Sequence, residues 1–178
     1  GRKSGVWVED TMEDALNLAT QSCMRHQEEH PDGNYSRLGF IKNALTLAKP
    51  MLAVHPSKFD EDPWILNTPK GAIDLMAGSA RMSENNRYLM QTRVAPRRIA
   101  TPLWEKHLMD IMHGDKELVG YLQRLVGMSL VGDQNLKPDL SPVLSGLGRN
   151  GKGVFTQALI WALGDYAGVS SSRLLTAT

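Results

Sequence analysis

The sequence predicts a mainly helical α+β protein whose last part begins an α/β domain that binds phosphate. Three observations predict it. Apolar residues recur at helical spacing in several segments, and one short stretch is typical of two strands around a Pro/Gly turn. A glycine-rich loop then precedes another helical pattern. We place a mostly helical domain at residues 1–133, with a short β element near 64–82, and the start of the phosphate-binding domain at residues 134–178.

Two helices are expected within the first 55 residues. Asp10 or Thr11 can cap the first, which runs to about Glu29 and is followed by a Pro-Asp-Gly-Asn turn. Ser36 can cap the second helix, and Pro50 is expected to end it because proline removes a helical hydrogen bond.

The middle of the chain has a different pattern. A short helix is expected before Pro56, and residues 64–75 are typical of two short strands around a Pro/Gly turn. Gly78 marks another turn, after which residues 80–82 can add a third strand.

Two more helices are expected next. Thr101 at the N-cap with Pro102 at the first helical position is a strong start signal, and Gly114 ends that helix. Asp115 caps the following helix. The apolar face of that helix comprises Leu118, Tyr121, Leu122, Leu125 and Val126.

The glycine-rich loop from Gly146 to Gly153 has the G-x-x-x-x-G-K spacing of a Walker A phosphate loop. Its glycines let successive backbone N–H groups point at phosphate oxygens, and Lys152 can reach the β- and γ-phosphates. Helical spacing from 154 to 162 predicts a helix whose N-terminus faces the same anion, with Gly164 as its stop.

Two features of this loop depart from the usual pattern. Residues 140–145 must form the strand that leads into it, yet Pro142 would remove a ladder donor there. Gly153 stands where the motif has the Ser or Thr hydroxyl that holds Mg²⁺, and Thr156 lies one turn too deep to replace it. Any Mg²⁺ is therefore expected to be held through water or by acidic residues outside this chain.

A dinucleotide site is the alternative interpretation of the same glycines. Gly146, Gly148 and Gly151 also fit G-x-G-x-x-G, which requires a second strand ending in an acid about 20 residues further on. Asp165 is the one candidate, and it follows the helix stop with no room for a strand. The sequence therefore favours a triphosphate over a dinucleotide or a structural glycine-rich turn.

Residues 26–30 match H-x-x-E-H, the inverted zinc-protease signature. Two histidines four residues apart share a helix face, as zinc requires. Pro31 ends the helix at His30, where a rigid ligand is needed, and a histidine near a helix C-terminus is also explained by the helix dipole. A structural role is favoured, and no metal ligand is assigned.

The densest positive cluster comprises Arg93, Arg97 and Arg98. Arginines bind DNA phosphates in a salt-dependent way, but Tyr88 is the one aromatic residue near enough to stack on a base. A solvated surface or a subunit contact is favoured over a DNA contact.

The bulk composition limits the classes of protein. The chain has 178 residues, enough for one domain or for one domain and part of another, and its net charge of +1 confines any nucleic-acid site to a local patch. The single cysteine, Cys23, excludes an internal disulfide, and its helical spacing predicts a buried thiol. No apolar run reaches membrane-spanning length and no signal peptide is visible, which indicates a cytoplasmic protein with no membrane partner.

Several segments together resemble the phage/plasmid-type primase–helicase family, which includes the poxvirus primase–helicase. They are the "LN…G…DL" element at 64–75, the helical segment 114–133, the loop 146–152 and the sequence Leu-Gly-Asp-Tyr-Ala at 163–167. The resemblance runs from about Trp64 to the C-terminus. It implies a superfamily III helicase motor, related to AAA+ ATPases, that uses ATP and Mg²⁺ and assembles as a homo-oligomeric ring around DNA. It also implies a phage- or plasmid-encoded protein that works with other replication proteins in the bacterial cytoplasm.

Carried over to this chain, the resemblance assigns triphosphate binding to one set of residues: Gly146, Gly148, Asn150, Gly151, Lys152 and Gly153. It places no catalytic residue in the chain, because the acidic strand, the polar sensor and the arginine finger would lie beyond Thr178. We therefore expect a fragment, the first strand, loop and helix of a motor behind a helical domain, with little or no ATPase activity of its own. The alternative is a non-catalytic oligomerisation or DNA-binding module with a vestigial nucleotide loop, which Gly153 and Pro142 favour slightly.

Overall fold

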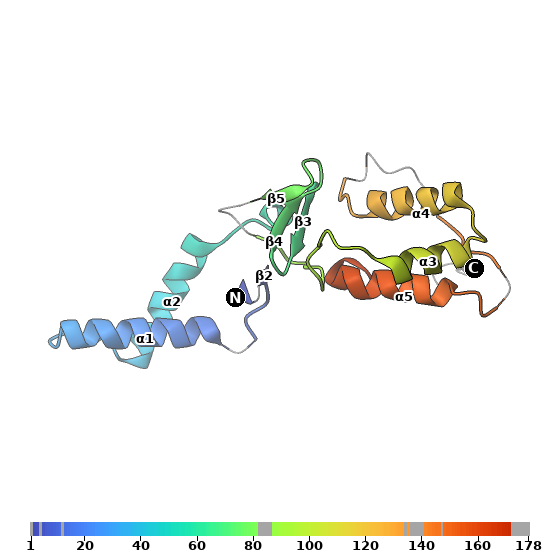
Figure 1. Cartoon of the computed structure of the whole chain (residues 1–178). Coiled ribbons are helices and arrows are strands. Elements are labelled where there is room, and N and C mark those ends of the chain that lie inside the picture. Colours follow the sequence, from blue (N-terminus) through green and yellow to red (C-terminus); the bar gives the residue numbers. More distant parts are fainter. Residues whose placement is uncertain are drawn as a thin grey trace.

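The computed structural model describes residues 2–3, 5–11, 13–81, 87–133, 135, 141–146 and 148–171. These residues form five α-helices and a three-stranded antiparallel sheet, so the structure is of the α+β class, as the sequence predicts. The sheet lies between a helical hairpin on one side and the other three helices on the opposite side (Figure 1).

A two-stranded hairpin near the N-terminus is an element that the sequence did not reveal. β1 (Arg2–Lys3) pairs antiparallel with β2 (Val6–Trp7). The backbone N–H of Trp7 donates to the carbonyl of Tyr88 at 2.7 Å, and its ring meets the edge of Phe59 at 5.9 Å between centroids. These contacts fasten the hairpin to the segment that follows the sheet.

α1 (Asp14–Glu29) and α2 (Leu38–Leu52) form the helical hairpin, which projects away from the sheet (Figure 1). α1 begins later than predicted, with Glu13 as its N-cap residue, but the Asp10 carboxylate accepts hydrogen bonds from the backbone N–H of Asp14 at 2.8 Å and of Ala15 at 2.9 Å. Pro50 lies inside α2, so the predicted stop was wrong. Proline in the last turn removes one backbone donor, and the turn survives that loss.

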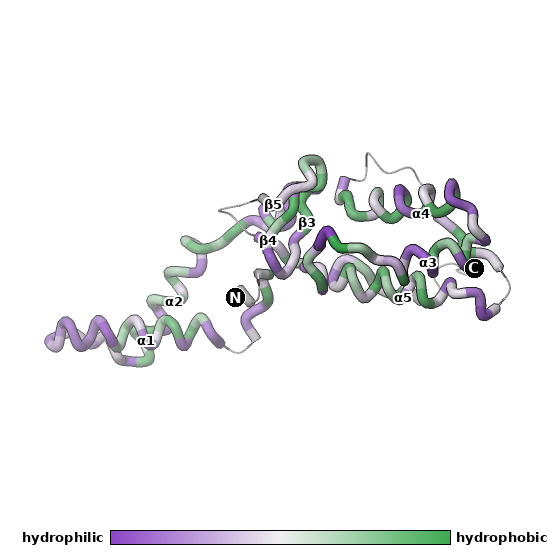
Figure 2. The backbone as a smooth tube through the Cα atoms, viewed as in Figure 1, coloured by the Kyte–Doolittle hydropathy of each residue, from purple (hydrophilic) through white to green (hydrophobic). Residues whose placement is uncertain are grey.

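This hairpin has little core of its own. No residue of α1 is buried, Ile41 is the one buried residue of α2, and Cys23 is half-buried rather than fully buried. Apolar side chains therefore remain exposed on the hairpin, and the hydropathy colouring of Figure 2 shows apolar residues along α2. The largest of them are Leu18, Met24, Leu38, Phe40, Leu47, Met51 and Leu52.

The central sheet matches its sequence pattern. A 3₁₀ turn, η1, spans Pro56–Lys58 and begins at the proline rather than before it. β3 (Ile65–Thr68), β4 (Gly71–Asp74) and β5 (Ser79–Arg81) follow in that spatial order, with Ile65 opposite Asp74 and Ala72 opposite Arg81. All four residues of β3 are buried, so this strand is the centre of the core. Met82, expected at the end of the third strand, lies outside the described residues.

α3 (Pro102–Ile111), α4 (Lys116–Ser129) and α5 (Lys152–Leu163) form the third part, and the 3₁₀ turn η3 (Gly164–Tyr166) ends α5. The predicted cap of α4 is confirmed, since the Asp115 carboxylate accepts from the N–H of Leu118 at 2.9 Å. α3 packs along α5, where the rings of Trp104 and Phe155 stack at 5.9 Å (Figure 1). Leu118 and Tyr121 on α4 are exposed, contrary to their predicted packing.

The strand expected before the glycine-rich loop is not formed. Residues 141–146 have no regular secondary structure, and Leu140 lies outside the described residues. A strand needs a neighbouring strand to exchange backbone hydrogen bonds with. The two described sheets consist of β1–β2 and β3–β4–β5, and neither pairs with this segment. Pro142 also lacks a backbone N–H.

Residues 91–93 join the sheet to the end of α5. The N–H of Thr92 donates to Asn67 on β3 at 3.0 Å, while the N–H of Arg93 donates to Ala162 on α5 at 3.1 Å. Gly164 allows this close approach, because a Cβ there would lie 2.8 Å from the backbone of this segment and its φ is +58°.

None of the helices in the described part of the chain combines the length and the apolar character that crossing a bilayer requires.

Candidate nucleotide site

The glycine-rich loop curls in front of the N-terminus of α5. Gly151 is the N-cap and Lys152 is the first helical residue, so the loop leads directly into the helix, as predicted. The Lys152 ammonium donates to the carbonyl of Gly146 at 2.9 Å and to Oδ1 of Asn150 at 2.7 Å. Three of the predicted binding residues therefore meet at one point, and the lysine closes the loop on itself.

Two other predicted residues lie in open space beside this point. Gly148 and Gly153 are exposed, and no heavy atom outside their own chain neighbourhood lies within 4 Å of the position of a Cβ on either. Leu147, between the first two glycines, lies outside the described residues. The exposed side of the loop thus has room for an anion next to the first backbone N–H groups of α5.

Gly151 is where α3 supports the loop. Its φ is +82°, and a Cβ would lie 2.5 Å from Cγ2 of Ile111 and 2.8 Å from Cε1 of His107. A side chain at this position would meet both backbone strain and a collision. The loop therefore depends on a glycine here for its position against α3.

His107 of α3 lies against the loop, next to Gly151. Its Nε2 is buried and has no hydrogen-bond partner among the residues that the structure describes. No motif spacing links His107 to the loop, because the contact depends on how α3 packs along α5.

A cavity of about 610 Å³ opens beside the loop, a volume in the range of small-molecule sites. Its polar side is formed by Ser145, Gly146, Asn150 and Lys152, and its apolar side by α3 and α4 residues such as Ile111 and Tyr121. No aspartate or glutamate is among the described residues that line it. The cavity can hold a phosphate-bearing ligand next to Lys152 but supplies no carboxylate that could activate a water molecule.

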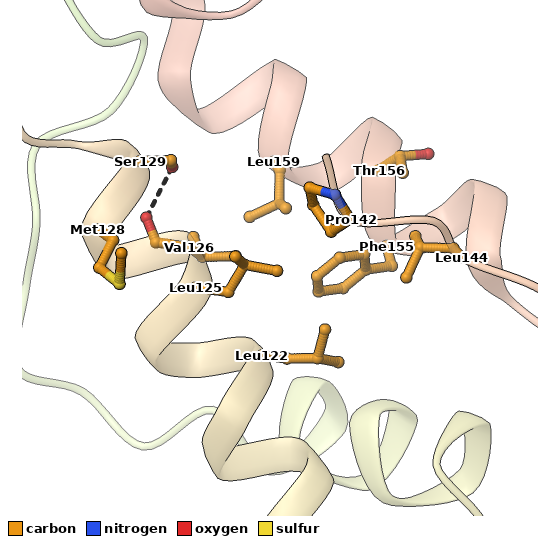
Figure 3. Close-up of a pocket in the computed structure, with 10 residues that line it drawn as sticks. All are labelled: Leu122, Leu125, Val126, Met128, Ser129, Pro142, Leu144, Phe155, Thr156 and Leu159. Atoms are coloured by element: carbon orange, nitrogen blue, oxygen red, sulfur yellow. Dashed lines mark hydrogen bonds between the residues drawn. The ribbon is translucent and has the colours of Figure 1, made fainter. Parts of the chain in front are cut away.

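A second, apolar groove of about 390 Å³ adjoins this cavity between α4 and α5. Figure 3 shows that Leu125 and Val126 of α4 face Phe155 and Leu159 of α5 across it, with Pro142 beside the α5 residues. The groove therefore borders the segment that the sequence predicts to be a strand.

The described residues do not fit direct Mg²⁺ ligation. Gly153 has no hydroxyl, and the Thr156 hydroxyl donates to the backbone carbonyls of Lys152 at 3.2 Å and Gly153 at 3.1 Å. That hydroxyl is thus directed at its own helix rather than at the loop. The described residues of the cavity lining include no carboxylate, the usual protein ligand of Mg²⁺.

The three arginines of the predicted cluster have different surroundings. The Arg93 guanidinium lies over the ring of Trp161 on α5, 5.7 Å from its centroid. Arg97 and Arg98 instead line a cavity of about 510 Å³ at the sheet, together with Lys70. All three arginines are exposed, and the pair Arg97 and Arg98 has a lysine nearby.

Comparison with known proteins adds an independent observation. The family model described as D5 N terminal like matches residues 1–113, more than half of the chain. The match includes the first 60 residues, where the resemblance read from the sequence is weaker, and ends before α4 and the glycine-rich loop. Comparisons with curated proteins and with solved structures found no significant match.

Proposed function

This chain belongs to the D5 N terminal like family, the N-terminal domain of D5-like primase–helicase proteins, and from this premise we propose that it leads into an ATP-driven DNA helicase motor. The family points to a replication primase–helicase protein of phage or plasmid type. The further steps of the proposal are that the protein is a superfamily III helicase, that it forms a homo-oligomeric ring, and that it moves along DNA in a bacterial cytoplasm with other replication proteins.

The observation that carries the proposal is the position of the Lys152 ammonium. It lies inside the curl of the loop, within 3 Å of two neutral acceptors, Gly146 O and Asn150 Oδ1. A triphosphate would offer this ammonium anionic oxygens in their place, and charge-assisted hydrogen bonds are stronger than neutral ones. The N-terminus of α5 favours an anion at the same point.

The same geometry supports low ATPase activity of the chain by itself. Triphosphate hydrolysis needs a residue that positions water and an arginine that stabilises charge, in addition to the loop. The cavity beside Lys152 has no acidic lining residue among those described. We therefore propose that the acidic residues, and any Mg²⁺ ligands, come from outside this chain.

Calorimetry tests the proposal by measuring how tightly a non-hydrolysable ATP analogue binds in the presence of Mg²⁺. The measurement is made on this chain and on the full gene product that contains it. Lys152→Ala should weaken binding about ten- to 150-fold, since a hydrogen bond to a charged group contributes about 1.5–3 kcal/mol. Lys42→Ala, on the exposed face of α2, is the matched control and should leave binding unchanged. Analogue binding that Lys152→Ala leaves intact would count against a phosphate loop.

The second candidate is a non-catalytic oligomerisation or DNA-binding module in which the loop is vestigial. The exposed apolar surface of the helical hairpin favours it, above all Leu47, Met51 and Leu52, which are at least 70% exposed. This candidate predicts that the gene product self-associates or binds DNA normally but shows no nucleotide binding that depends on Lys152. The same calorimetry, combined with light scattering, therefore separates the two functions.

A further inference from the structure

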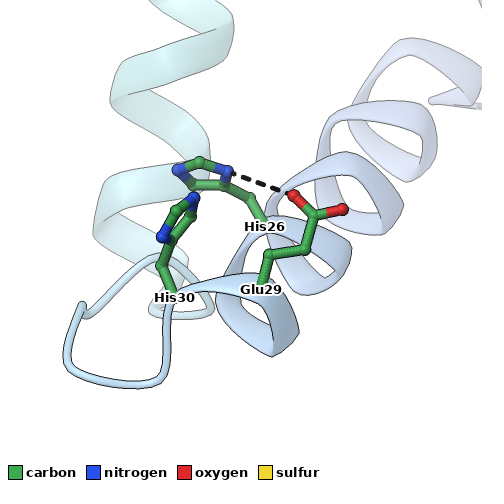
Figure 4. A group of neighbouring side chains, drawn as sticks. All are labelled: His26, Glu29 and His30. Atoms are coloured by element: carbon green, nitrogen blue, oxygen red, sulfur yellow. Dashed lines mark ion pairs between the residues drawn. The ribbon is translucent and has the colours of Figure 1, made fainter.

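We propose that His26, Glu29 and His30 form a binding site for a zinc-class transition-metal ion at the tip of the helical hairpin. One ligand atom from each residue lies within 4.8 Å of those of the other two. Figure 4 shows the two imidazole rings next to each other, with the Glu29 carboxylate reaching toward His26. Nδ1 of His26 lies 4.0 Å from Oε2 of Glu29.

The spacing of these residues produces the cluster. His26 and Glu29 lie three residues apart on one face of the last turn of α1, and His30 follows as the C-cap residue, with its N–H still bonded to the carbonyl of His26. The described contacts of His26 are with Glu29, His30 and Tyr35. None of these contacts involves a charged side chain of the turn that follows α1. The cluster is exposed and open to an ion from solvent.

His30 lies where Pro31 ends the helix, and hydrogen bonds hold its backbone there. The side-chain amide of Gln27 donates to the carbonyls of His30 at 3.3 Å and Pro31 at 3.1 Å, and its oxygen accepts from the N–H of Tyr35 at 2.8 Å. The N–H of His30 also donates to the carbonyl of His26 at 3.0 Å. Gln27 thus holds the turn closed and fixes the backbone that carries His30.

Aromatic contacts hold the rings from the other side. The Tyr35 ring meets His26 at 4.5 Å and His30 at 6.5 Å, and on its far side it meets Phe40 of α2 at 5.2 Å. The exposed imidazoles therefore contact Tyr35 of the turn, and Tyr35 contacts Phe40 of α2. An ion bound to them would hold the last turn of α1 and its C-cap residue, with α2 reached only through these ring contacts.

The donor set selects the class of ion. Ligand atoms around one tetrahedral zinc lie about 3.3 Å apart, given bonds of about 2.0–2.2 Å, so small side-chain rotations bring the three atoms into place. Two imidazole nitrogens and one carboxylate suit Zn²⁺, Co²⁺, Ni²⁺ or Cu²⁺, whereas Mg²⁺ and Ca²⁺ prefer oxygen ligands alone. The negative end of the α1 dipole adds attraction for a cation.

A metal here would stabilise the end of α1 and the turn that leads to α2. α1 buries no side chain, and α2 buries one, so the hairpin has few other interactions to keep its helices together. An ion that binds the folded hairpin and not the unfolded chain stabilises the fold by mass action. The fourth coordination position faces solvent and is filled by water in this proposal.

The test uses the full chain without a polyhistidine tag, freed of metal with a chelator and titrated with Zn²⁺ by calorimetry. We expect one Zn²⁺ per chain, a melting temperature that rises with Zn²⁺ and not with Mg²⁺, and a Co²⁺ adduct with the visible absorption of a four-coordinate site. His26→Ala or His30→Ala should each weaken binding by about tenfold or more, since even residues outside the ligand set contribute about 10–100-fold to metal affinity.

Three further variants make the test specific. Glu29→Gln keeps the helix and removes a ligand, so it should weaken Zn²⁺ binding even if a histidine variant unfolds. His113→Ala removes an exposed histidine elsewhere, and Cys23→Ser removes the thiol one turn before His26; both should bind Zn²⁺ as the wild type does. Wild-type affinity in the folded double variant His26→Ala/His30→Ala, or loss of binding in Cys23→Ser, would overturn the assignment.

Discussion

Asp60 lies between the helical hairpin and the sheet and binds the segment that follows the sheet. Its φ is +47°, its N–H donates to the carbonyl of Arg87 at 3.0 Å, and its carboxylate accepts from the N–H of Leu89 at 3.2 Å. Burial raises the pKa of the Asp60 carboxyl above its usual value, and the hydrogen bond from Leu89 only partly opposes that rise. The folded state therefore favours the neutral carboxyl and is less stable when Asp60 is charged.

Asp60→Asn should raise the melting temperature at neutral pH. Because the folded pKa of Asp60 lies above the unfolded one, the stability that its protonated form contributes is present at low pH and is lost as pH rises through the folded pKa. The amide keeps an acceptor for Leu89 and tolerates a positive φ. The gain should vanish below about pH 4, where the carboxyl is neutral in both states.

Thermal melts of wild type and Asp60→Asn across this pH range measure the effect. Glu28→Gln, an exposed charge on α1, is the control and should show no such pH dependence. A lower melting temperature for Asp60→Asn at neutral pH would show that the charged carboxylate stabilises the contact with Arg87 and Leu89.

Gly153→Ser is the corresponding residue-scale test of the loop. Space around Gly153 is open, so the serine fits without a collision and restores the hydroxyl that phosphate loops use for Mg²⁺. In the gene product, we expect tighter binding of a Mg²⁺–nucleotide complex and unchanged binding of nucleotide without Mg²⁺. Calorimetry with and without Mg²⁺ measures this, and weaker Mg²⁺–nucleotide binding by the variant would contradict it.

At the scale of elements, the contact between β3 and η3 connects the two halves of the molecule. The Tyr166 hydroxyl accepts from the backbone N–H of Asn67 at 3.2 Å, and the Asn67 side-chain amide donates to the carbonyl of Met90 at 2.8 Å. Asn67 is only 3% exposed, so its groups have little access to water. Burial also raises the pKa of the Tyr166 hydroxyl, which stays neutral and keeps this geometry at physiological pH.

Tyr166→Phe should lower the free energy of unfolding by about 1–3 kcal/mol, because it leaves the buried N–H of Asn67 without its acceptor. Chemical denaturation measures the loss, and hydrogen exchange should show faster exchange of the Asn67 amide and of η3. Tyr121→Phe, on the exposed face of α4, makes the same chemical change as a control and should cost little. Equal stability of Tyr166→Phe and wild type would mean that η3 is held by the backbone contacts of Gln91 and Arg93 alone.

Elements with local signals could be predicted from the sequence. Asp115 and the Thr101-Pro102 pair mark helix starts because a cap involves only neighbouring residues. The strand at 140–145 could not be judged in this way, since a strand depends on partners elsewhere in the chain. β1 and β2 have two residues each, too few for an alternation to be recognised.

In the candidate site, too, local features could be predicted from the sequence and contacts between distant helices could not. Glycine spacing and Lys152 predicted a loop that leads into a helix, and the structure has that local geometry. The contact of His107 with Gly151 and the stacking of Arg93 on Trp161 come from the packing of distant helices, for which a single sequence has no local signal.

At the scale of the whole molecule, the charge is nearly balanced, so DNA affinity must come from a local patch. Arg97, Arg98 and Lys70 line one cavity at the sheet, with the two arginines exposed. Arg93 is engaged with Trp161, and its replacement by alanine should cost about 0.5–1 kcal/mol of stability rather than DNA affinity. The pair Arg97 and Arg98 therefore gives the clearest test of the proposed DNA contact.

If this pair contacts phosphates, Arg97→Ala/Arg98→Ala should weaken single-stranded DNA binding and make it less sensitive to salt. Each phosphate contact contributes about 0.7 to the slope of log affinity against log salt, so the slope should fall by about 1.4. Fluorescence anisotropy over a salt series measures it, with Lys42→Ala/Lys49→Ala on α2 as a control of equal charge. An unchanged slope would leave the two arginines as a solvated surface or a subunit contact, the roles that the sequence favours. For a subunit contact, sedimentation of the same variant would then show a weaker assembly, because a cationic pair at a subunit interface contributes to association in a salt-dependent way.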